Sequence, residues 1–461
     1  MIRRPPRSTR KESSAASDVY KRQSLDANTT ASNNTAVGYF SLSANTTGTR
    51  NTAVGTASLD ANTTANDNTA IGYDAMGSNT TGAQNTAVGT YTFDANTTGS
   101  FNTAVGRAAL SSNTTADHNT AIGFQALDVN TTGANNTAAG SAALDANTTG
   151  NSNTAIGKEA LTTNTTGGDN TALGRRALNS NTTANSNTAI GLEAMYANTT
   201  GTANVAVGSR ALDANTTANF NTAVGLSALT ANTTGAENTA IGESGLGSNT
   251  TGTGNAAIGR SALFNTTTGS NNTGLGYKAG LNVTTGGNNF FVGYNTGTSG
   301  SPGGAVTSGN NEGVLGNSSV SKINTQVSLT VASDERDKTD FQPLSAGLDF
   351  VNELTPYTYY WDKRTKYVDW KQNPDTDLNT IEHDGTHKED WMDIGFKAQD
   401  VVALEESIGH TLDDKTNLVS NQTGDGKQYQ LQYEKFVPIL VKAVQELSAK
   451  VEELESKLNG E

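Results

Sequence analysis

The chain has 461 residues, of which 34% are hydrophobic, 6% are aromatic and 49 are glycine. This composition supplies too little apolar bulk for an ordinary globular core along the whole length, although the length allows more than one domain. The formal net charge of −14 argues against a general nucleic-acid binder. The lack of cysteine excludes disulfides and thiolate metal sites, and the lack of a long apolar run argues against a membrane span.

Residues 1–23 match nothing that follows them. They hold seven Lys or Arg and two acidic residues, and they lack the apolar segment of a secretory signal. The stretch closely resembles the translation of sequencing-adapter read-through. We therefore expect it to be an artefact, and we expect the natural N-terminus to be missing together with any anchor or targeting segment.

A strict repeat of 17 residues runs over 24–297. The glycine of the NTAVG or NTAIG motif recurs from Gly38 to Gly293 as sixteen marks without a slip, and the NTT triplets, which begin at Asn28, keep the same step. One apolar site also recurs in phase, at Leu25, Leu42, Leu59, Met76 and Phe93. No unit this short buries enough surface alone, so stability must come from stacking neighbours.

This repeat predicts an all-β parallel β-solenoid or β-roll. Each unit has two short extended stretches, around Thr-Ala-Val and around Asn-Thr-Thr, separated by turns that contain glycine. At about 4.8 Å per coil, the rod would be roughly 75 Å long. We expect ladders of Asn and Thr side chains, and glycines in left-handed turns. The thin apolar stripe is expected to be buried against copies of the chain, with three chains around one axis.

The units resemble the head repeats of trimeric autotransporter adhesins and the shafts of phage tail fibres. The adhesin unit is usually shorter, so the handedness stays open. Three other interpretations compete with a structural ladder: N-glycosylation at the NTT sequons, calcium-binding turns and an ice-binding Thr face. Strict periodicity favours the ladder over glycosylation, Asp occurs too irregularly for calcium, and regular Thr is what any β-solenoid contains.

The chain changes character after the repeats. Gly, Ser and Pro mark a connector over 298–332. Within it, four alternating apolar residues predict a strand or two: Val320, Ile323, Val327 and Leu329. Residues 334–461 hold 27 acidic and 14 basic residues, whereas 24–297 hold 14 and 8, so the charge is concentrated behind the connector.

Four stretches of 333–461 stand in a characteristic order. They are the opening SDERDKTDFQPL, the aromatic block LDFVNELTPYTYYWD, the helix start IGFKAQDVVALEE and the closing LQYEKFVPILVKAVQELSAKVEELESKL. On these stretches the segment resembles the peptidase S74 family, the intramolecular chaperones at the C-termini of phage tail spikes and fibres. The resemblance implies a small α+β chaperone domain, with strands in the aromatic block.

The resemblance also implies self-cleavage of the bond between Ser333 and Asp334, with Ser333 as nucleophile and Lys338 as general base. A lysine serves as a base only when neutral, and burial in an apolar pocket favours that form. Attack of Ser333 on its own carbonyl would give a strained four-membered lactone, so we expect attack on a neighbouring chain. Arg336 receives no catalytic role. Taken alone, SDERDK would indicate only a solvated turn.

The closing helix carries an uninterrupted heptad pattern over 436–458. One position holds Val437, Val444, Val451 and Leu458, and the other holds Leu440, Leu447 and Leu454. We expect a self-associating coiled coil rather than an amphipathic helix lying on its own core. Val with Leu does not decide between two and three strands.

Other candidate chemistry is weak. His383 and His387 stand four residues apart, but Gly385 between them indicates a charged loop rather than a metal site. Six aromatic residues are expected in the small domain's core: Tyr357, Tyr359, Tyr360, Trp361, Trp370 and Trp391. We expect no cofactor and no metal.

The sequence therefore predicts a homotrimeric tail-fibre or appendage protein in a virion or the extracellular space. Its expected partners are its own copies and a host surface receptor or glycan, without nucleic acid or membrane insertion. Three alternatives stay open. The first is a bacterial surface adhesin with a chaperone that does not cleave, the second is an ice- or glycan-binding repeat protein, and the third is an enzyme whose site lies further upstream.

Overall fold

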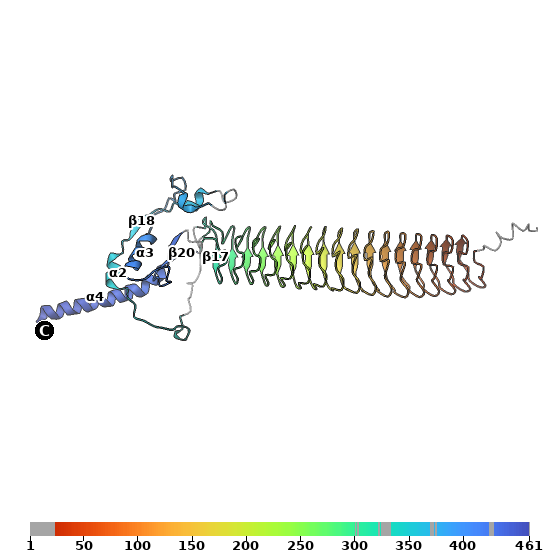
Figure 1. Cartoon of the computed structure of the whole chain (residues 1–461), viewed down its shortest axis with the longest axis horizontal. Coiled ribbons are helices and arrows are strands. Elements are labelled where there is room, and N and C mark those ends of the chain that lie inside the picture. The colour runs from red at the N-terminus through yellow and green to blue at the C-terminus, as the bar shows by residue number, and fades with distance from the viewer. Residues whose placement is uncertain are drawn as a thin grey trace, which may run out of the picture. The chain divides into compact units, whose positions relative to one another are not determined.

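The computed structural model describes residues 24–299, 301, 304–320, 323, 333–368, 373, 376–423 and 428–460. The chain divides into two compact units, Met1–Ser261 and Ala262–Glu461. The described residues include seventeen three-residue strands of a parallel β-solenoid, fourteen in the first unit and three in the second (Figure 1). A small α+β region follows in the second unit and ends in a long helix.

The strands occupy one place in each repeat. They are β1 (Thr35–Val37), β2 (Thr52–Val54), β3 (Thr69–Ile71), β4 (Thr86–Val88), β5 (Thr103–Val105), β6 (Thr120–Ile122), β7 (Thr137–Ala139), β8 (Thr154–Ile156), β9 (Thr171–Leu173), β10 (Thr188–Ile190), β11 (Val205–Val207), β12 (Thr222–Val224), β13 (Thr239–Ile241), β14 (Ala256–Ile258), β15 (Thr273–Leu275), β16 (Phe290–Val292) and β17 (Gly313–Leu315).

Register in the solenoid follows the repeat. In the sixth coil, Thr120 pairs with Thr137, one repeat further along. Because side chains alternate along a strand, Ala121 points inward and is fully buried, whereas Ile122 points outward and is 46% exposed. The Asn-Thr-Thr stretch does not form a second strand. It is bent, but its backbone still bonds the next coil, with Thr131 N donating to Thr148 O at 3.0 Å.

Two asparagine ladders run inside the rod, as the repeat predicts. In the first, Asn130 Nδ2 donates to Asn113 Oδ1 at 2.9 Å, and Asn113 Nδ2 donates to Asn96 Oδ1 at 3.2 Å. In the second, Asn136 N donates to Asn119 Oδ1 at 3.0 Å. These asparagines are at most 1% exposed. Buried amides must be hydrogen-bonded, and each coil satisfies those of its neighbours. The NTT sequons therefore present an amide that is buried and already bonded.

The core of the rod is filled by its own chain. The inward-facing alanine of the strand and the recurring Leu, for example Ala121 and Leu127, are fully buried in the single chain. The expectation that the apolar stripe is buried against other copies is therefore wrong for its alanine and leucine, because each coil folds around them. The apolar residues left outside include the third residues of the strands, such as Ile122 and Leu173, which are 46% and 42% exposed.

Left-handed backbone is more common than the sequence predicts. Gly123 has φ +138°, as expected for the motif glycine, but Gln125, Leu127 and Asn135 of the same coil also have φ between 53° and 61°. Such angles are uncommon for a leucine. Here they let N–H groups two residues apart point to opposite neighbouring coils: Gln125 N donates to Arg107 O, and Leu127 N donates to Ala143 O. Bonding between coils therefore decides the backbone.

The solenoid extends into the segment expected to be a connector. β17 pairs with β16 through an insertion, since Phe290 lies opposite Gly313, 23 residues further on. At this end Phe291 takes the inward place that alanine holds in β1 to β14, and it is fully buried. Gly297 makes room for the ring, because a Cβ there would lie 2.4 Å from Phe291. Val327 and Leu329, expected in a strand, lie outside the described residues.

The C-terminal region contains short elements around one small core. They are η1 (Glu335–Asp337), α2 (Leu348–Glu353), β18 (Tyr357–Tyr359), η2 (Arg364–Tyr367), η3 (Leu378–Thr380), β19 (Asp393–Gly395), α3 (Ala398–Ser407), β20 (Ser420–Gln422), β21 (Tyr429–Leu431), η4 (Tyr433–Lys435) and α4 (Phe436–Asn459). β18 pairs with β19, and β20 with β21, both antiparallel. The buried core consists of Ala346, Phe350, Val401, Val419, Phe436 and Ile439.

The aromatic block differs from its prediction in two ways. Its first half is the helix α2, which buries Phe350, and only its second half forms a strand, β18. The expected aromatic core is wrong, because Tyr360, Trp361 and Trp391 are 42% to 49% exposed and Tyr357 and Tyr359 are half-buried. The sixth expected core residue, Trp370, lies outside the described residues.

The closing helix α4 has two apolar faces. Phe436, Ile439 and Ala443 are buried in the domain. The heptad residues point elsewhere and are exposed by 45% to 87%: Val437, Leu440, Val444, Leu447, Val451, Leu454 and Leu458. Among the described residues no helix is long and apolar enough to cross a bilayer.

Candidate active site

A short turn brings together the two residues that the sequence singled out for catalysis. Lys338 Nζ lies 2.6 Å from Ser333 Oγ and 3.3 Å from the Ser333 carbonyl oxygen. The single turn of η1 closes the five-residue separation, with Lys338 N donating to Glu335 O at 3.1 Å. A hydroxyl this close to an amine can transfer its proton directly, which is the arrangement a serine–lysine pair requires.

The residue on the other side of the predicted scissile bond is held by a separate ion pair. Asp334 caps η1 by accepting from Arg336 N at 2.9 Å, and Arg336 Nη2 donates to its carboxylate at 2.6 Å. The Arg336 side chain is the main cause that holds the pKa of Asp334 below its usual range. Arg336 occupies the Asp334 carboxylate, whereas Lys338 donates to Ser333. Arg336 thus contacts the predicted site without touching the reacting hydroxyl.

The site is open to water in the single chain. Ser333, Asp334 and Lys338 are all exposed. An apolar wall that excludes water would favour a neutral amine, and the described residues of one chain place no such wall around this turn. Ser333 and Lys338 are therefore in hydrogen-bond contact, but without the burial that would favour a neutral lysine.

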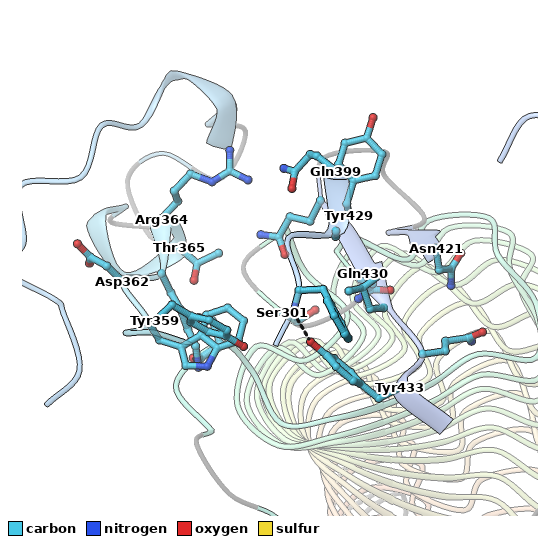
Figure 2. Close-up of a pocket in the computed structure, with 18 of the residues that line it drawn as sticks. Ser301, Tyr359, Asp362, Arg364, Thr365, Gln399, Asn421, Tyr429, Gln430 and Tyr433 are labelled. Atoms are coloured by element: carbon cyan, nitrogen blue, oxygen red, sulfur yellow. Dashed lines mark hydrogen bonds between the residues drawn. The ribbon is translucent and has the colours of Figure 1, made fainter. Parts of the chain in front are cut away.

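The second unit also contains a cavity of about 750 Å³, whose lining does not include the serine–lysine pair. Figure 2 shows Tyr359 at one side of it and Tyr429, Gln430 and Tyr433 on the other side. Tyr433 is fixed by Phe396 N, which donates to its hydroxyl at 3.1 Å. Two of the aromatic residues that the sequence assigned to a core, Tyr359 and Trp361, thus line this cavity.

The two histidines four residues apart lie in a loop, as Gly385 indicated. Tyr367 anchors that loop: its hydroxyl donates to Asp362 at 2.8 Å and accepts from Gly385 N at 3.1 Å. His383 Nδ1 lies 3.6 Å from Asp362, and the His387 ring meets Tyr367 edge-on at 4.6 Å. In the part of the chain that the structure describes, no group of three or more His, Cys, Asp or Glu residues is placed to hold a metal ion.

Sequence reasoning missed a set of contacts just after the serine–lysine turn. Ser345 Oγ lies 2.8 Å from His410 Nε2, and His410 Nδ1 lies 2.9 Å from Thr416 O. Because a carbonyl only accepts, Nδ1 carries the proton and Nε2 accepts from Ser345. On α4, Lys442 and Glu446 contact the backbone around Ser345. The sequence signal that could have found Lys442 and Glu446 is their spacing: they lie four residues apart on the closing helix, outside its heptad positions.

A family comparison covers the segment that holds these features. Residues 333–410 match the Peptidase S74 family, described as chaperone of endosialidase. Neither the curated proteins nor the solved structures gave a match to this chain. The family implies a self-cleaving, peptidase-like chaperone. A match to this chaperone family at residues 333–410, after a solenoid shaft of 17-residue repeats, fits a tail-fibre- or tail-spike-like protein.

Proposed function

We propose that the protein is the shaft of a virion tail fibre or related extracellular appendage, assembled as a homotrimer by a C-terminal chaperone that then cuts itself off between Ser333 and Asp334. The observation that carries this proposal is the 2.6 Å contact between Lys338 Nζ and Ser333 Oγ within a chaperone-of-endosialidase domain. The shaft is the lasting product, and cleavage happens once per chain.

The exposed face of α4 supports assembly. Val444, Leu447 and Leu454 are 50% to 64% exposed and stand in heptad register, on a face of the helix beside the one that buries Ile439. An uninterrupted apolar heptad face in water gains free energy by packing against other copies. Parallel helices bring the C-terminal ends of the shafts together first.

The solenoid supplies a second surface for the same trimer. The third residue of each of the seventeen strands is aliphatic: Val, Ile, Leu or, once, Ala139. Neighbouring outward positions vary freely, for example Thr56, Lys158 and Leu226. Leu173 and Leu275 show that hydrophobicity, rather than β-branching, is kept along this column. We place this column at the axis of the trimer.

The repeat itself explains why a removable trimerisation domain would be needed. Coils with the same interior do not distinguish one partner coil from the next, so register between chains is weakly specified. A domain that trimerises first holds the three C-termini level, and the shafts then assemble from that end. Removing the domain afterwards leaves the shaft kinetically trapped.

For attachment, we propose a host surface receptor or glycan as the shaft's partner. Exposed aromatic side chains stand on the turns of the first coils, where Tyr73 and Tyr91 are 49% and 42% exposed and meet edge-on at 5.2 Å. Exposed aromatic patches commonly mark binding surfaces. Binding of the cleaved fibre to host cells, with loss of binding on Tyr73→Ser and Tyr91→Ser, tests this role.

In the proposed cleavage, Lys338 Nζ takes the proton of Ser333 Oγ as the oxygen attacks the Ser333 carbonyl carbon of a neighbouring chain. A C–O bond forms, the C–N bond to Asp334 breaks, and the proton passes to the departing amine. Water then hydrolyses the ester and restores the hydroxyl. Attack between chains avoids the four-membered ring and makes the reaction report assembly. The neighbours also supply the cover that the single chain lacks.

The first experiment is expression of residues 24–461 followed by intact-mass measurement. We expect a released piece beginning at Asp334 from the wild type, and whole chains from Ser333→Ala and from Lys338→Met. Lys415→Met, which changes an exposed lysine away from the site, is the matched control and should cleave normally. A wild-type trimer that stays whole would refute the protease and leave only a chaperone.

The second experiment separates attack between chains from attack within one chain. Mixed trimers of Ser333→Ala chains, marked by a mass tag, and uncut wild-type chains should release the domain from the tagged chain. Cleavage confined to untagged chains would exclude attack on a neighbour.

A further inference from the structure

The long helix α4 holds the backbone that follows the serine–lysine turn. Lys442 Nζ donates to the carbonyl of Leu344 and, at 3.1 Å, to that of Ser345. Glu446 Oε2 accepts from Leu348 N at 2.6 Å. The two side chains also pair with each other at 3.4 Å. One helix turn thus supplies a donor and an acceptor to a single stretch of main chain.

Gly347 shows how closely this backbone approaches the helix. A Cβ built there would lie 2.3 Å from Glu446 Oε2, so any larger residue must displace the carboxylate. The carboxylate faces the N–H group at the start of α2, where the unpaired donors of a helix favour negative charge. The Leu348 N–H is the main cause that lowers the pKa of Glu446. The Glu446 carboxylate is thus held against residues 347 and 348 by charge, by a hydrogen bond and by close packing.

The contact connects the serine–lysine turn to the helix α4, which is proposed to associate with other copies. Residue 344 follows Lys338 by six residues, so the held backbone tethers the turn within about 20 Å of α4. Next to Lys442 on the same helix, Val441 and Val444 are exposed, whereas Ile439 is buried in the domain. Lys442 and Glu446 follow Ile439 by three and seven residues, so the helix presents one side to its own core and to the strap at 344–348, and another side to other copies.

We propose that Lys442 and Glu446 are positioning residues that couple assembly of α4 to placement of the Ser333–Lys338 turn against a neighbouring chain. This inference rests on the proposed cleavage. When three α4 helices associate, each strap takes a defined place around the bundle, and the tethered turn is confined to the region that the next chain occupies. Without the two contacts the helices still associate, but the strap loses its polar bonds to α4. It is then held less precisely, by the bond of Ser345 to His410 and by the packing of Leu344 and Ala346 on the core.

The test compares cleavage with assembly in chains 24–461. Lys442→Met and Glu446→Ala should trimerise as the wild type does, by cross-linking and native mass spectrometry, but release the domain about tenfold to a hundredfold more slowly, as expected when reacting groups are misplaced. Lys442→Arg and Glu446→Gln keep a donor and an acceptor and should cleave within about threefold of the wild type. Gly347→Ala displaces the carboxylate while both side chains remain, and it should be as slow as Glu446→Ala.

The matched control is the other spaced pair on α4. Lys457 and Glu453 also form an ion pair four residues apart, and Lys457→Met with Glu453→Ala should leave cleavage unchanged. Trimers of Glu446→Ala and Gly347→Ala that cleave at the wild-type rate overturn the proposal. Loss of trimers in the same variants also overturns it, because the pair would then serve assembly. A wild-type trimer that never cleaves refutes the proposed function itself, and with it this role.

Discussion

The solenoid and the C-terminal domain treat their polar and apolar groups in opposite ways. In the solenoid, each buried amide is bonded by the coil one repeat away, and Ala121 and Leu127 fill an interior made by one chain. The C-terminal domain buries only a small cluster around Phe350 and Ile439, and it leaves a whole face of α4 exposed. The comparison teaches that the shaft's interior is complete within one chain, whereas the information for joining chains is concentrated in the domain that is proposed to be removed.

The largest expected effect comes from breaking the exposed face of α4. Val444→Asp together with Leu447→Asp places two charges at heptad positions and should abolish trimers and domain release, because buried unpaired charges are too costly for the interface. The domain itself should keep its fold, since both residues lie outside its core. Sedimentation and circular dichroism check this, and Glu452→Asp on the same helix is the control. Normal trimers from the double variant would assign assembly to another surface.

In the shaft, the motif glycine is the most sensitive position. Gly123 has φ +138°, and a Cβ there would lie 2.5 Å from the Gly140 carbonyl oxygen. We expect Gly123→Ala to destabilise the coil by about 3 kcal/mol or more. Gly133→Ala is the matched control. A Cβ there would also lie close, 2.4 Å from the Gly150 carbonyl oxygen, but the backbone lacks the positive φ, and alanine already stands at the equivalent place in other coils, such as Ala116. Thermal unfolding of both variants tests the contrast. Equal melting temperatures for the two variants would show that the backbone adjusts to an added Cβ at either position.

Breaking one rung of an asparagine ladder should cost somewhat less. Asn113→Ala removes the donor to Asn96 Oδ1 and to Ala116 O, and the acceptor for Asn130 Nδ2. Leaving buried partners unpaired costs about 1–3 kcal/mol. Denaturant unfolding measures the loss, and Thr132→Ala, at an exposed position, should change stability by less than about 0.5 kcal/mol. An undiminished midpoint for Asn113→Ala would mean that water replaces the missing amide.

The smallest effect is a pH dependence of the shaft. Burial, with Asp74 and Asp128 adding to it, raises the pKa of Asp94 from 3.8 to about 6. A raised acid pKa means that the folded chain binds this proton more tightly than the unfolded chain, so stability is lost as pH rises from about 4 through 6. Asp94→Asn should therefore raise the melting temperature at pH 8 and leave it unchanged at pH 3.5, modestly because the side chain is half exposed to screening solvent.

Asp67→Asn is the opposite control for that experiment. Its pairing with Arg50 lowers the pKa of Asp67, so this carboxylate stabilises the shaft above its ordinary pKa and loses that effect as pH falls through the lowered value. Asp67→Asn should lower the melting temperature at neutral pH only. If both variants shift in the same direction at pH 8, charge pairing between coils does not govern the pH response.

Repetition made the architecture predictable, but it did not predict the backbone in detail. A residue that recurs every 17 positions must meet its own kind in the next coil, so the Asn ladders followed directly from the pattern. Positive φ at Leu127 did not follow, because intrinsic preference opposes it. The second strand expected in each repeat, around Asn-Thr-Thr, does not form. The stretch is bent instead, and its asparagine side chains point inward and bond to those of the neighbouring coils.

The C-terminal region shows where sequence reasoning reached its limit. The contact between Ser333 and Lys338 follows from one local turn, and local spacing is visible in a sequence. The aromatic residues near Trp361 were placed in the core because large rings usually lie there. β18 belongs to a two-stranded sheet, and Trp361 lies at its margin with 42% of its surface exposed. The core is formed instead by α2, α3 and α4.

By itself, the sequence determined the length of the repeat, the composition of the rod's interior, the heptad helix and the residues of the serine–lysine turn. These features depend on spacing along the chain. Tertiary structure alone decided that Ala121 and Leu127 lie inside their own chain, that α4 divides its surface between a core and an exposed face, and that Lys442 and Glu446 reach the main chain at 344–348. These depend on which segments meet in space, because hydrogen bonds and apolar contacts between segments far apart in sequence outweigh the preferences of single residues.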